Sequence, residues 1–433
     1  MRLLFLCLLS LITTFTYAQR FVEVKNGLFY QNEQPYFFIG ANYWYGMNLG
    51  IDGSAGNRAR LVRELDELQA MGVTNLRIMG ASEGPDTEPY RMSPALQPAP
   101  GEYNEQVFQG LDFLLEEMRK RDMKAVVTLN DFWIWSGGMA QYIAWADQES
   151  MVYSPPVENT DWHNYQQHTS SFFNHKKANK LYRKFLKTII DRTNTVSKVK
   201  YKDDPTIMSW QLGNEPRGYG NTEAYRNWIH ETARFIQKKD KNHLVSIGSE
   251  GNTGSHHAGT NFLEDHRSEY IDYGTMHIWI ENWSWYDPTK GMEDMDSAIM
   301  KATAYLEHHL DKSKELGKPL VLEEFGVARD NGSFEQSATT QNRDRFFDEI
   351  FQLVYKKAAS GMVGCNFWCW SGEGRPVEAG GLWHAGDPLT GDPPHEKQGW
   401  YSVYDSDQST IEVIEKYAEL INALKSSSEV SLK

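Results

Sequence analysis

Two glutamates, Glu215 and Glu324, follow apolar runs that predict buried strands. The first run, 207–212, leads into Gly-Asn-Glu-Pro, and the second, 319–322, leads into Glu-Glu-Phe-Gly. Proline cannot donate to a sheet ladder, so the first strand must end at Pro216 and leave Glu215 at its rim. Two carboxyl groups about 5 to 5.5 Å apart can cleave a glycosidic bond with retention, one as proton donor and the other as nucleophile. We therefore expect Glu215 and Glu324 to face each other across a cleft.

Strand and helix patterns alternate along the rest of the chain. Eight strands are predicted near residues 37–42, 75–78, 125–130, 207–212, 244–248, 273–277, 320–324 and 364–370. Amphipathic helices are predicted near residues 58–71, 105–121, 176–192, 222–239, 295–316, 340–359 and 410–424. Alternating elements imply a parallel sheet, and eight such units close into a (β/α)8 TIM barrel whose active site lies at the carboxyl ends of the strands.

Two further patterns refine this fold prediction. An Asn26-Gly27 turn between short alternating runs predicts an N-terminal β-hairpin, which we place over the floor of the barrel. The segments 80–104, 131–174 and 371–408 are long, aromatic-rich loops that we expect to form the walls of the site. An open doubly wound sheet would need a Gly-rich phosphate loop after the first strand, and Gly40-Ala41-Asn42-Tyr43-Trp44 is not one.

Composition narrows the functional classes. The 433 residues carry a formal charge of −14, which argues against nucleic-acid binding because that needs a basic footprint. The 14 Trp and 22 Tyr residues suit a surface on which a polyhydroxylated ligand stacks, as well as ordinary core packing. We expect no cofactor and no metal: a His-Glu-x-x-His motif is absent, and His256-His257 lies in a Gly/Ser/Thr-rich turn.

The N-terminus predicts export. Arg2 precedes an apolar run at 3–12, and Ala18 provides a small-residue cleavage site, so we interpret residues 1–18 as a signal peptide and 19–433 as a single catalytic domain. The apolar run is too short to span a membrane. Cys365 and Cys369 would lie about 13 Å apart on a strand, too far for a disulfide. We expect an extracellular or periplasmic monomer.

The two acidic motifs resemble those of family 5 glycoside hydrolases in the large retaining clan. That family carries Asn-Glu-Pro at the fourth strand and Glu-Phe/Trp/Tyr-Gly at the seventh, which match Asn214-Glu215-Pro216 and Glu324-Phe325-Gly326. The resemblance implies that Glu215 is the acid/base and Glu324 the nucleophile. It also implies that Asn214 donates a hydrogen bond to the 2-hydroxyl of the sugar.

Other positions match the family one by one. Arg77 resembles the arginine that keeps the nucleophile ionised, His277 resembles the histidine that lines the catalytic subsite, and Trp368 resembles the platform under the reacting sugar. Asn130, at the end of the third strand, also matches. Many members carry His-x-Tyr at the sixth strand, whereas this chain has His277-Ile278-Trp279, so either the indole of Trp279 or another tyrosine must replace the phenol.

Glu323 competes with Glu324 for the role of nucleophile. Adjacent strand residues point to opposite faces, so we expect only one of the two to enter the cleft. The family position, directly before Phe-Gly, favours Glu324. Glu323 is then expected to face the helices or a neighbouring strand.

Substrate specificity rests on a narrower resemblance. Asn214-Glu215-Pro216-Arg217 is similar to the bacterial β-mannanase branch, in which this arginine contacts sugars on the leaving-group side. The segments 277–283 and 398–405 look like bacterial mannanases too. We therefore predict endo-hydrolysis of β-1,4-mannan, galactomannan and glucomannan. Candidate sugar platforms are Trp44, Trp133, Trp135, Trp162, Trp285 and Trp383.

Two other functions remain open at this stage. An endo-β-1,4-glucanase or another retaining β-glycanase would use the same barrel and the same pair of glutamates. A carbohydrate-binding barrel without turnover usually lacks one catalytic acid, whereas this chain retains both. In each case the partner is a neutral polysaccharide or oligosaccharide.

Overall fold

The computed structural model describes residues 20–253, 255 and 257–424. The predicted signal peptide and His256 therefore lie outside the described residues. Eight parallel strands form the central sheet, in the order β8-β7-β6-β5-β4-β11-β10-β9. They are β4 (Phe38–Asn42), β5 (Asn75–Met79), β6 (Lys124–Thr128), β7 (Ile207–Gln211), β8 (Leu244–Ser246), β9 (Gly274–Ile278), β10 (Leu320–Phe325) and β11 (Met362–Phe367).

The sheet curls into a barrel that closes between β8 and β9. Asp272 N donates to Val245 O at 2.9 Å, and His277 N donates to Glu250 O at 3.1 Å. A backbone-to-side-chain hydrogen bond also joins the two strands at this closure: Ser249 N donates to Thr275 Oγ1 at 2.9 Å. All eight strands are buried along their whole length, as expected for a parallel sheet with both faces covered. The predicted TIM barrel is confirmed.

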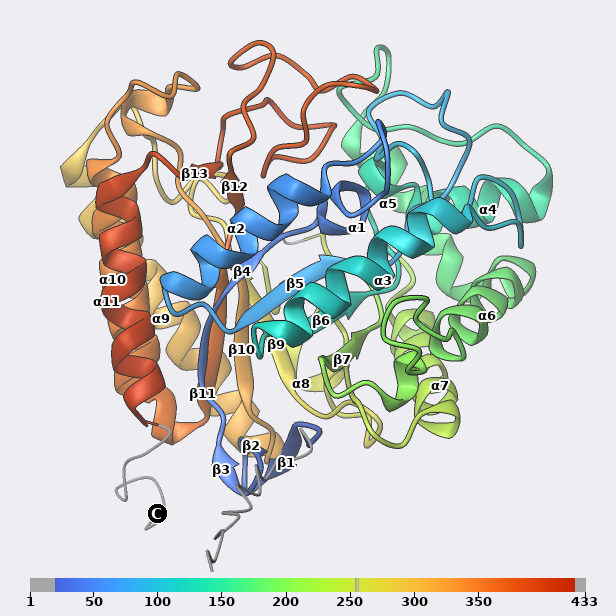
Figure 1. Ribbon diagram of the computed structural model, residues 1–433, viewed down its shortest axis with the longest axis horizontal. Helices are drawn as coiled ribbons and strands as arrows, with labels where there is room; N and C mark the ends of the chain where they lie inside the picture. Colours follow the sequence, from blue (N-terminus) through green and yellow to red (C-terminus); the bar gives the residue numbers. More distant parts are fainter. Residues whose placement is uncertain (1–19, 254, 256, 425–433) are drawn as a thin grey trace, which may run out of the picture.

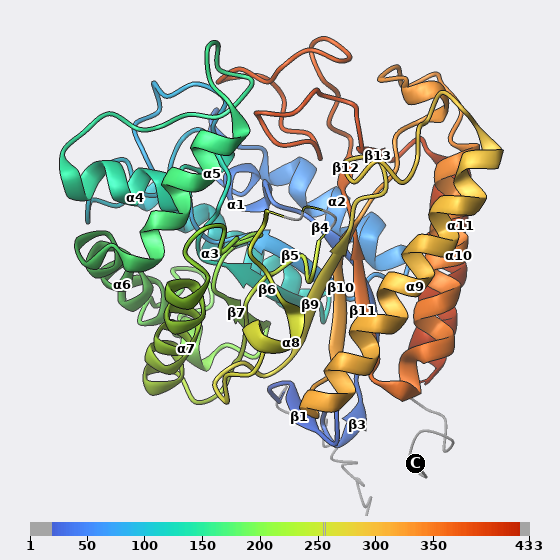
Figure 2. The same ribbon diagram turned by 180° about the vertical axis from the view of Figure 1, so that it is seen from behind.

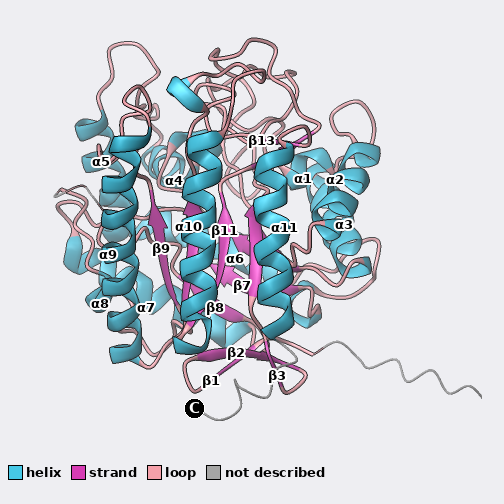
Figure 3. Ribbon diagram, turned by 90° about the vertical axis from the view of Figure 1, so that its left-hand side faces the viewer, coloured by secondary structure: helices cyan, strands magenta, loops and turns pink. Residues whose placement is uncertain are grey.

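Helices surround the barrel (Figures 1 and 2). The outer helices are α2 (Arg58–Ala70), α3 (Glu105–Lys120), α6 (Lys176–Ile190), α7 (Thr222–Lys239), α9 (Met292–Leu316), α10 (Gln341–Lys357) and α11 (Gln408–Ala423). Figure 3 shows α9, α10 and α11 side by side outside the strands. Each predicted helix is present, with ends shifted by three residues at most.

Helix α6 illustrates how the sequence pattern sets this packing. Its buried residues include Tyr182, Phe185 and Ile189, which recur at helical spacing, while Lys180 and Lys184 remain exposed on the opposite face. The side chain of His175 caps the first turn by accepting a hydrogen bond from Ala178 N at 3.2 Å. The apolar stripe therefore fixes which face of α6 covers the barrel.

The two ends of the barrel differ in structure. At the floor lies a small antiparallel sheet of β1 (Glu23–Lys25), β2 (Leu28–Gln31) and β3 (Gln34–Pro35), opposite the long loops (Figure 1). Its turn places Asn26 and Gly27 at φ 51° and 73°, the left-handed conformation that a two-residue Asn-Gly hairpin requires. The predicted hairpin is confirmed, with β3 as an additional strand.

The long loops contain more regular structure than the sequence predicted. Segment 131–174 forms α4 (Gly138–Asp147) and α5 (Trp162–Ser170), which pack around a small apolar cluster. Most of α4 is buried and apolar on all sides, so its sequence lacks the amphipathic period that reveals a surface helix. The remaining short elements are α1 (Gly46–Leu49), α8 (Phe262–Asp265), β12 (Trp370–Gly372), β13 (Val403–Tyr404), η1 (Ile134–Ser136), η2 (Ser171–Asn174), η3 (Tyr201–Asp203), η4 (Asp330–Gly332) and η5 (Ala358–Ser360).

One buried ion pair joins the loop after β10 to the start of α11. Arg329 Nη2 donates to both carboxylate oxygens of Asp407 at 2.6 and 2.7 Å, and Arg343 Nη1 donates to Asp407 at 3.3 Å. Both arginine side chains are almost completely buried. Asp407 therefore balances two buried cations.

In the part of the chain that the structure describes, no helix combines the length and apolarity needed to cross a membrane.

We predict that Asp407→Ala lowers the free energy of unfolding by about 3 to 5 kcal/mol, because it leaves buried guanidinium groups uncompensated. Asp348→Ala provides the matched control, since Asp348 pairs with Lys416 at the surface. That change should cost less than about 1 kcal/mol. Urea unfolding followed by circular dichroism measures both variants. Equal effects of the two substitutions would contradict the role assigned to Asp407.

Candidate active site

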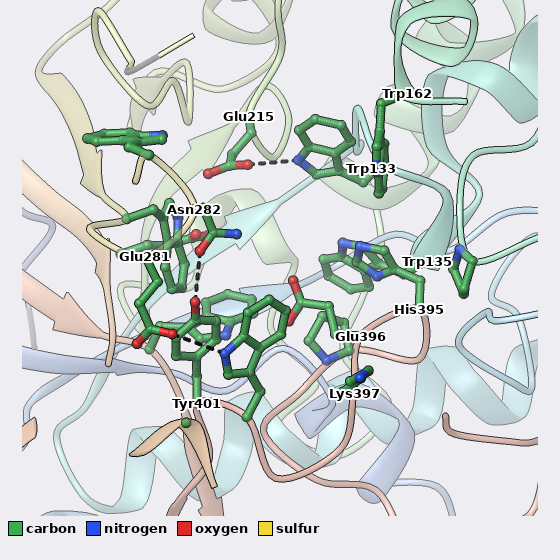
Figure 4. Close-up of a pocket in the computed structure, with 18 of the residues that line it drawn as sticks. Trp133, Trp135, Trp162, Glu215, Glu281, Asn282, His395, Glu396, Lys397 and Tyr401 are labelled. Atoms are coloured by element: carbon green, nitrogen blue, oxygen red, sulfur yellow. Dashed lines mark hydrogen bonds between the residues drawn. The ribbon is translucent and has the colours of Figure 1, made fainter. Parts of the chain in front are cut away.

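Glu215 lies just beyond β7, at the end of the barrel where the long loops meet. Its amide donates to Gly248 O at 2.8 Å, which extends the strand contact up to the glutamate itself. Its backbone has φ 48°, a left-handed conformation that non-glycine residues seldom adopt and that concentrates at functional sites. The side chain points into a cavity (Figure 4). The structure therefore holds Glu215 at the rim that the sequence predicted.

Glu324 lies on β10 beside Arg77 of β5. The Nη1 of Arg77 donates to Glu324 Oε1, and its Nη2 donates to Asn214 Oδ1 at 2.8 Å. Burial alone would lower the pKa of Arg77, but the charges of Glu324, Glu323 and Glu215 outweigh that effect and raise it. Arg77 is thus a fixed positive charge against the expected nucleophile.

His277 of β9 bridges the two glutamates. Its Nδ1 lies 2.6 Å from Glu215 Oε1 and 3.2 Å from Glu324 Oε2. One oxygen of each carboxyl group and one ring nitrogen of His277 all lie within 4.8 Å of one another. Retaining glycosidases place their carboxyl groups about 5 to 5.5 Å apart, whereas inverting ones leave about 6.5 to 9.5 Å for a water. The spacing fits retention.

Proton sharing couples Glu215 to His277. Burial would raise the pKa of Glu215, but the hydrogen bond and charge of His277, the charge of Arg217 and the hydrogen bond from Trp133 lower it to about 2. Burial would lower the pKa of His277, yet the charge of Glu324 and the hydrogen bond to Glu215 raise it well above the usual value. These opposite shifts favour a charged His277 beside an ionised Glu215.

Strand parity predicted that Glu323 faces the helices or a neighbouring strand, but its side chain contacts β7 across the barrel instead. The pairing of β10 with β9 shifts register between Leu322 and Glu324, so an extra residue is accommodated at Glu323. This bulge interrupts the alternation of faces. The Glu323 carboxylate instead accepts from Gln211 Nε2, with both oxygens at 2.8 Å. Both adjacent glutamates are therefore directed to the barrel interior.

Three of the predicted binding residues lie beneath the cavity rather than on its wall. Arg77, His277 and Asn130 are almost fully buried and are not among the residues that line it. Asn130 Oδ1 accepts from Asp131 N at 2.8 Å. Asn214 does line the cavity, and its Nδ2 donates to Asp131 Oδ1 at 3.2 Å. Arg77 and His277 thus contact the catalytic pair from below, while Asn130 holds the neighbouring Asp131.

Trp133 and Arg217 form one side of the cavity next to Glu215. Trp133 Nε1 donates to Glu215 Oε2 at 2.7 Å, and the Arg217 guanidinium lies 4.9 Å from the centroid of the Trp133 ring. Glu250 accepts from Arg217 Nε and Nη2 at 2.7 and 2.9 Å. Trp133 is therefore positioned to orient the acid as well as to contact a sugar.

Aromatic rings form the opposite side. The centroids of Trp279 and Trp368 lie 5.9 Å apart, edge to face, and Tyr401 packs against Trp279 at 5.0 Å. Tyr401 Oη donates to Asn282 Oδ1 at 2.8 Å, so its hydroxyl proton is directed to Asn282 and not to Glu324. Among the described contacts of Glu324, Arg77 and His277 provide the polar partners, so neither indole nor phenol takes the place expected of the family tyrosine.

The predicted sugar platforms separate into two groups. Trp133, Trp135, Trp162 and Trp368 line the cavity. Trp44 lies beneath the loop after β11, where its Nε1 donates to Gly391 O at 2.6 Å and its ring packs on Trp135. Trp44 is buried there and is not among the residues that line the cavity. Trp285 and Trp383 also lie off the lining.

Sequence reasoning missed two polar residues on the loop after β11, His395 and Glu396. Both line the cavity, and Glu396 projects toward its centre (Figure 4). His395 Nδ1 and Glu396 Oε2 are buried without a hydrogen-bond partner in the described structure. Burial raises the pKa of Glu396 well above its usual value and lowers that of His395 to about 3. No motif marked them, because the loop brings them to the site only through its tertiary path.

The cavity has a volume of about 1440 Å³. Loops after six strands, β6 to β11, contribute its described lining, whereas the loops after β4 and β5 do not. Glu215, His277 and Glu324 are the group of potential metal ligands that the described residues bring together. His277 Nδ1 lies against both carboxyl groups and Arg77 donates to Glu324, so the arrangement suits proton transfer.

Comparison with known proteins agrees with this geometry. The family model described as GH family 5 beta-mannosidase-like matches residues 19–426. Mannan endo-1,4-beta-mannosidase 1 of Solanum lycopersicum is 30% identical over 80% of this chain and 83% of its own length. A putative mannan endo-1,4-beta-mannosidase 4 of Arabidopsis thaliana is 31% identical over 87% of this chain and 91% of its own length.

Solved structures give a further match. A glycoside hydrolase family 5 mannosidase from Rhizomucor miehei superposes with a TM-score of 0.87 at 39% identity, covering 94% of this chain and 98% of its own. One structure of a point mutant of that enzyme contains mannosyl-fructose. These relatives are from plants and a fungus, so the resemblance to the bacterial mannanase branch stays a prediction.

We predict that Glu215→Gln lowers turnover of unactivated glycosides by about 10²- to 10⁴-fold, the range that general acid catalysis supplies. Glu324→Gln should abolish turnover and leave ligand binding intact, because it removes the attacking carboxylate and keeps the shape. Initial rates together with calorimetric titration of an oligosaccharide measure both effects. Activity of Glu324→Gln within a few-fold of the unmodified protein would refute the assignment of the nucleophile.

Proposed function

Because this chain belongs to the β-mannosidase-like group of glycoside hydrolase family 5, we propose that it hydrolyses β-1,4-mannosidic linkages within mannan, galactomannan and glucomannan, with retention. It is a glycoside hydrolase of the mannanase type, in keeping with its plant relatives. The observation that carries the proposal is the close approach of Glu215 and Glu324 around His277 at the base of an aromatic-lined cavity.

The proposed reaction has two steps. Glu324, ionised beside Arg77, attacks the anomeric carbon while Glu215 delivers a proton to the leaving oxygen, and a glycosyl-enzyme ester forms. Glu215, now ionised, then takes a proton from water as that water attacks the ester. The proton released to the leaving sugar in the first step is thus recovered from water in the second.

Arg217 supports binding on the leaving-group side. Its contacts with Glu250 and with Gln166 Oε1 engage three of its N–H groups, out of the five that an arginine carries. The remaining two are available to sugar hydroxyls beside Glu215. Trp133 supplies an apolar face next to them, which suits the flat face of a pyranose.

A second candidate is removal of single mannosyl units from a chain end. The segment that contains Gly391, His395 and Glu396 lies against Trp44, just beyond β4, and lines the cavity. An internal bond of a long chain can be reached only in a cleft that is open at both ends, whereas a closed end suits a chain terminus. The similarity to a fungal family 5 mannosidase supports this candidate.

We also propose that the protein is exported, with residues 1–18 acting as a signal peptide. The apolar run at 3–12 and the small residue Ala18 support this proposal. Mass determination of the N-terminus of the protein recovered from its source would test it. An intact Met1 in the mature protein would refute it.

We predict reducing-sugar release from linear mannan, galactomannan and glucomannan by the purified protein, with carboxymethyl-cellulose left intact. Internal cleavage would lower the viscosity of glucomannan early in the reaction and give a ladder of oligosaccharides. Release of mannose without loss of viscosity would favour the chain-end candidate. Chromatography of the products alongside viscometry distinguishes the two.

Other outcomes of that experiment are equally informative. Cellulose activity equal to or above mannan activity would overturn the substrate assignment and favour an endo-β-1,4-glucanase on the same barrel. Inactivity on all four polymers would favour a carbohydrate-binding barrel that lacks turnover. Proton NMR of the anomeric signal of the first product tests retention.

We predict that Arg217→Ala lowers kcat/KM on short manno-oligosaccharides by about tenfold, the cost of losing a charged hydrogen bond. Long polymers should lose less, because other subsites compensate. Arg226→Ala is the matched control, since Arg226 of α7 pairs with Asp265 of α8 and neither residue lines the cavity. Kinetics on mannotriose to mannohexaose measure the effect. A loss that is independent of substrate length would contradict a role on the leaving-group side.

A further inference from the structure

Glu323 is a buried carboxylate whose charge the reaction itself does not use. Its side chain is 1% exposed, and one oxygen lies 3.9 Å from His277 Nε2 and 3.9 Å from Arg77 Nε. Its hydrogen bonds come from the Gln211 amide. Gln211 Oε1 in turn accepts from Arg77 Nε at 2.8 Å, so Gln211 separates Glu323 from Arg77 while binding both. Of the two basic groups near Glu323, Arg77 and His277, His277 is the one whose charge depends on pH.

Glu215 and His277 work as one acid. The 2.6 Å between His277 Nδ1 and Glu215 Oε1 lets the two groups share one proton, so the pair titrates as a unit. To donate to a leaving oxygen, the Nδ1–H bond must break and an Oε1–H bond must form on Glu215. The proton then passes to the leaving oxygen, which leaves His277 neutral and Glu215 ionised. The supply of acid depends on the proton affinity of this pair.

Charge changes around the pair during the reaction. Glu324 is ionised before attack and becomes a neutral ester in the glycosyl-enzyme, so its stabilisation of a proton on His277 disappears at that point. Glu323 takes part in neither bond change, and it lies at the opposite edge of the imidazole ring, 3.9 Å from His277 Nε2. The charged or titratable groups facing His277 are Glu215 beyond β7, Glu250 beyond β8, Glu323 and Glu324 on β10, and Arg77 on β5.

We propose that Glu323 is a positioning residue that acts through His277, raising the proton affinity of the Glu215–His277 pair together with Glu324 before attack and without Glu324 in the glycosyl-enzyme. This inference rests on the proposed function and adds the control of its acid. In the first step Glu323 keeps the acid loaded at neutral pH. In the second step it preserves the basicity with which the pair takes a proton from water.

We predict that in Glu323→Gln the alkaline limb of the pH profile of kcat/KM shifts to lower pH by about one unit or more. This is the effect of removing one opposite charge within about 4 to 6 Å. The direction follows because a pair with lower proton affinity loses its proton at lower pH. Asp265→Asn is the matched control, since Asp265 is a buried carboxylate that pairs with Arg226 and is not among the groups that contact His277. It should leave the limb in place.

A leaving-group comparison separates proton supply from general loss of structure. A 2,4-dinitrophenyl glycoside departs without protonation, so its glycosylation rate in Glu323→Gln should remain within about threefold of the unmodified protein. The rate on manno-oligosaccharides should fall by about tenfold or more, within the range of general acid catalysis. Equal losses on both substrates, or an unmoved alkaline limb, would overturn the proposal.

A third readout does not require activity. In protein labelled with ¹⁵N-histidine, the His277 signals are identified as those missing from His277→Gln, and their titration midpoint should fall in Glu323→Gln. An unchanged midpoint would refute the proposal even if the protein cleaves no mannan, whereas polymer assays alone decide the proposed function. If Glu323→Gln does not fold, Glu323→Asp, which withdraws the charge by one methylene, should lower the midpoint by a smaller amount; no change would again refute it.

Discussion

The guanidinium of Arg77 is the interaction on which the catalytic end of the barrel depends. From β5 it donates to Asn42 of β4, Gln211 of β7, Asn214 beyond β7 and Glu324 of β10. An arginine cannot lose its charge in a protein, so burial obliges the surrounding strands to present acceptors and at least one carboxylate. That requirement draws the nucleophile and the asparagine beside the acid into one network.

The network also explains why three carboxyl groups can share so small a volume. Like charges at this distance would normally force at least one carboxyl group to stay protonated. Here Arg77 lies between Glu324 and Glu323, and His277 lies between those two and Glu215. Two basic side chains therefore alternate with three acidic ones, and the proton that acid catalysis needs is shared between His277 and Glu215. Electrostatics and catalysis use the same contacts.

The cavity above this network is asymmetric. The side next to Glu215 carries Arg217, held by Glu250 and stacked on Trp133, while the loop after β11 brings His395 and Glu396 over the opposite region. Unpaired buried polar atoms in a cavity are costly unless a ligand satisfies them. The hydroxyl groups of a sugar would supply those partners. The shape of the cavity and its unmet hydrogen bonds thus both point to a carbohydrate.

The sequence by itself determined the barrel, the N-terminal hairpin and the two strand ends that carry Glu215 and Glu324, because hydrophobic period, turn residues and proline act locally. Tertiary structure decided the rest. The bulge at Glu323 turned a second carboxylate inward, which no alternation rule could foresee. The path of the loop after β11 buried Trp44 and delivered Glu396 to the cavity. Loop paths and bulges depend on contacts between residues far apart in the chain, whereas a sequence pattern records only near neighbours.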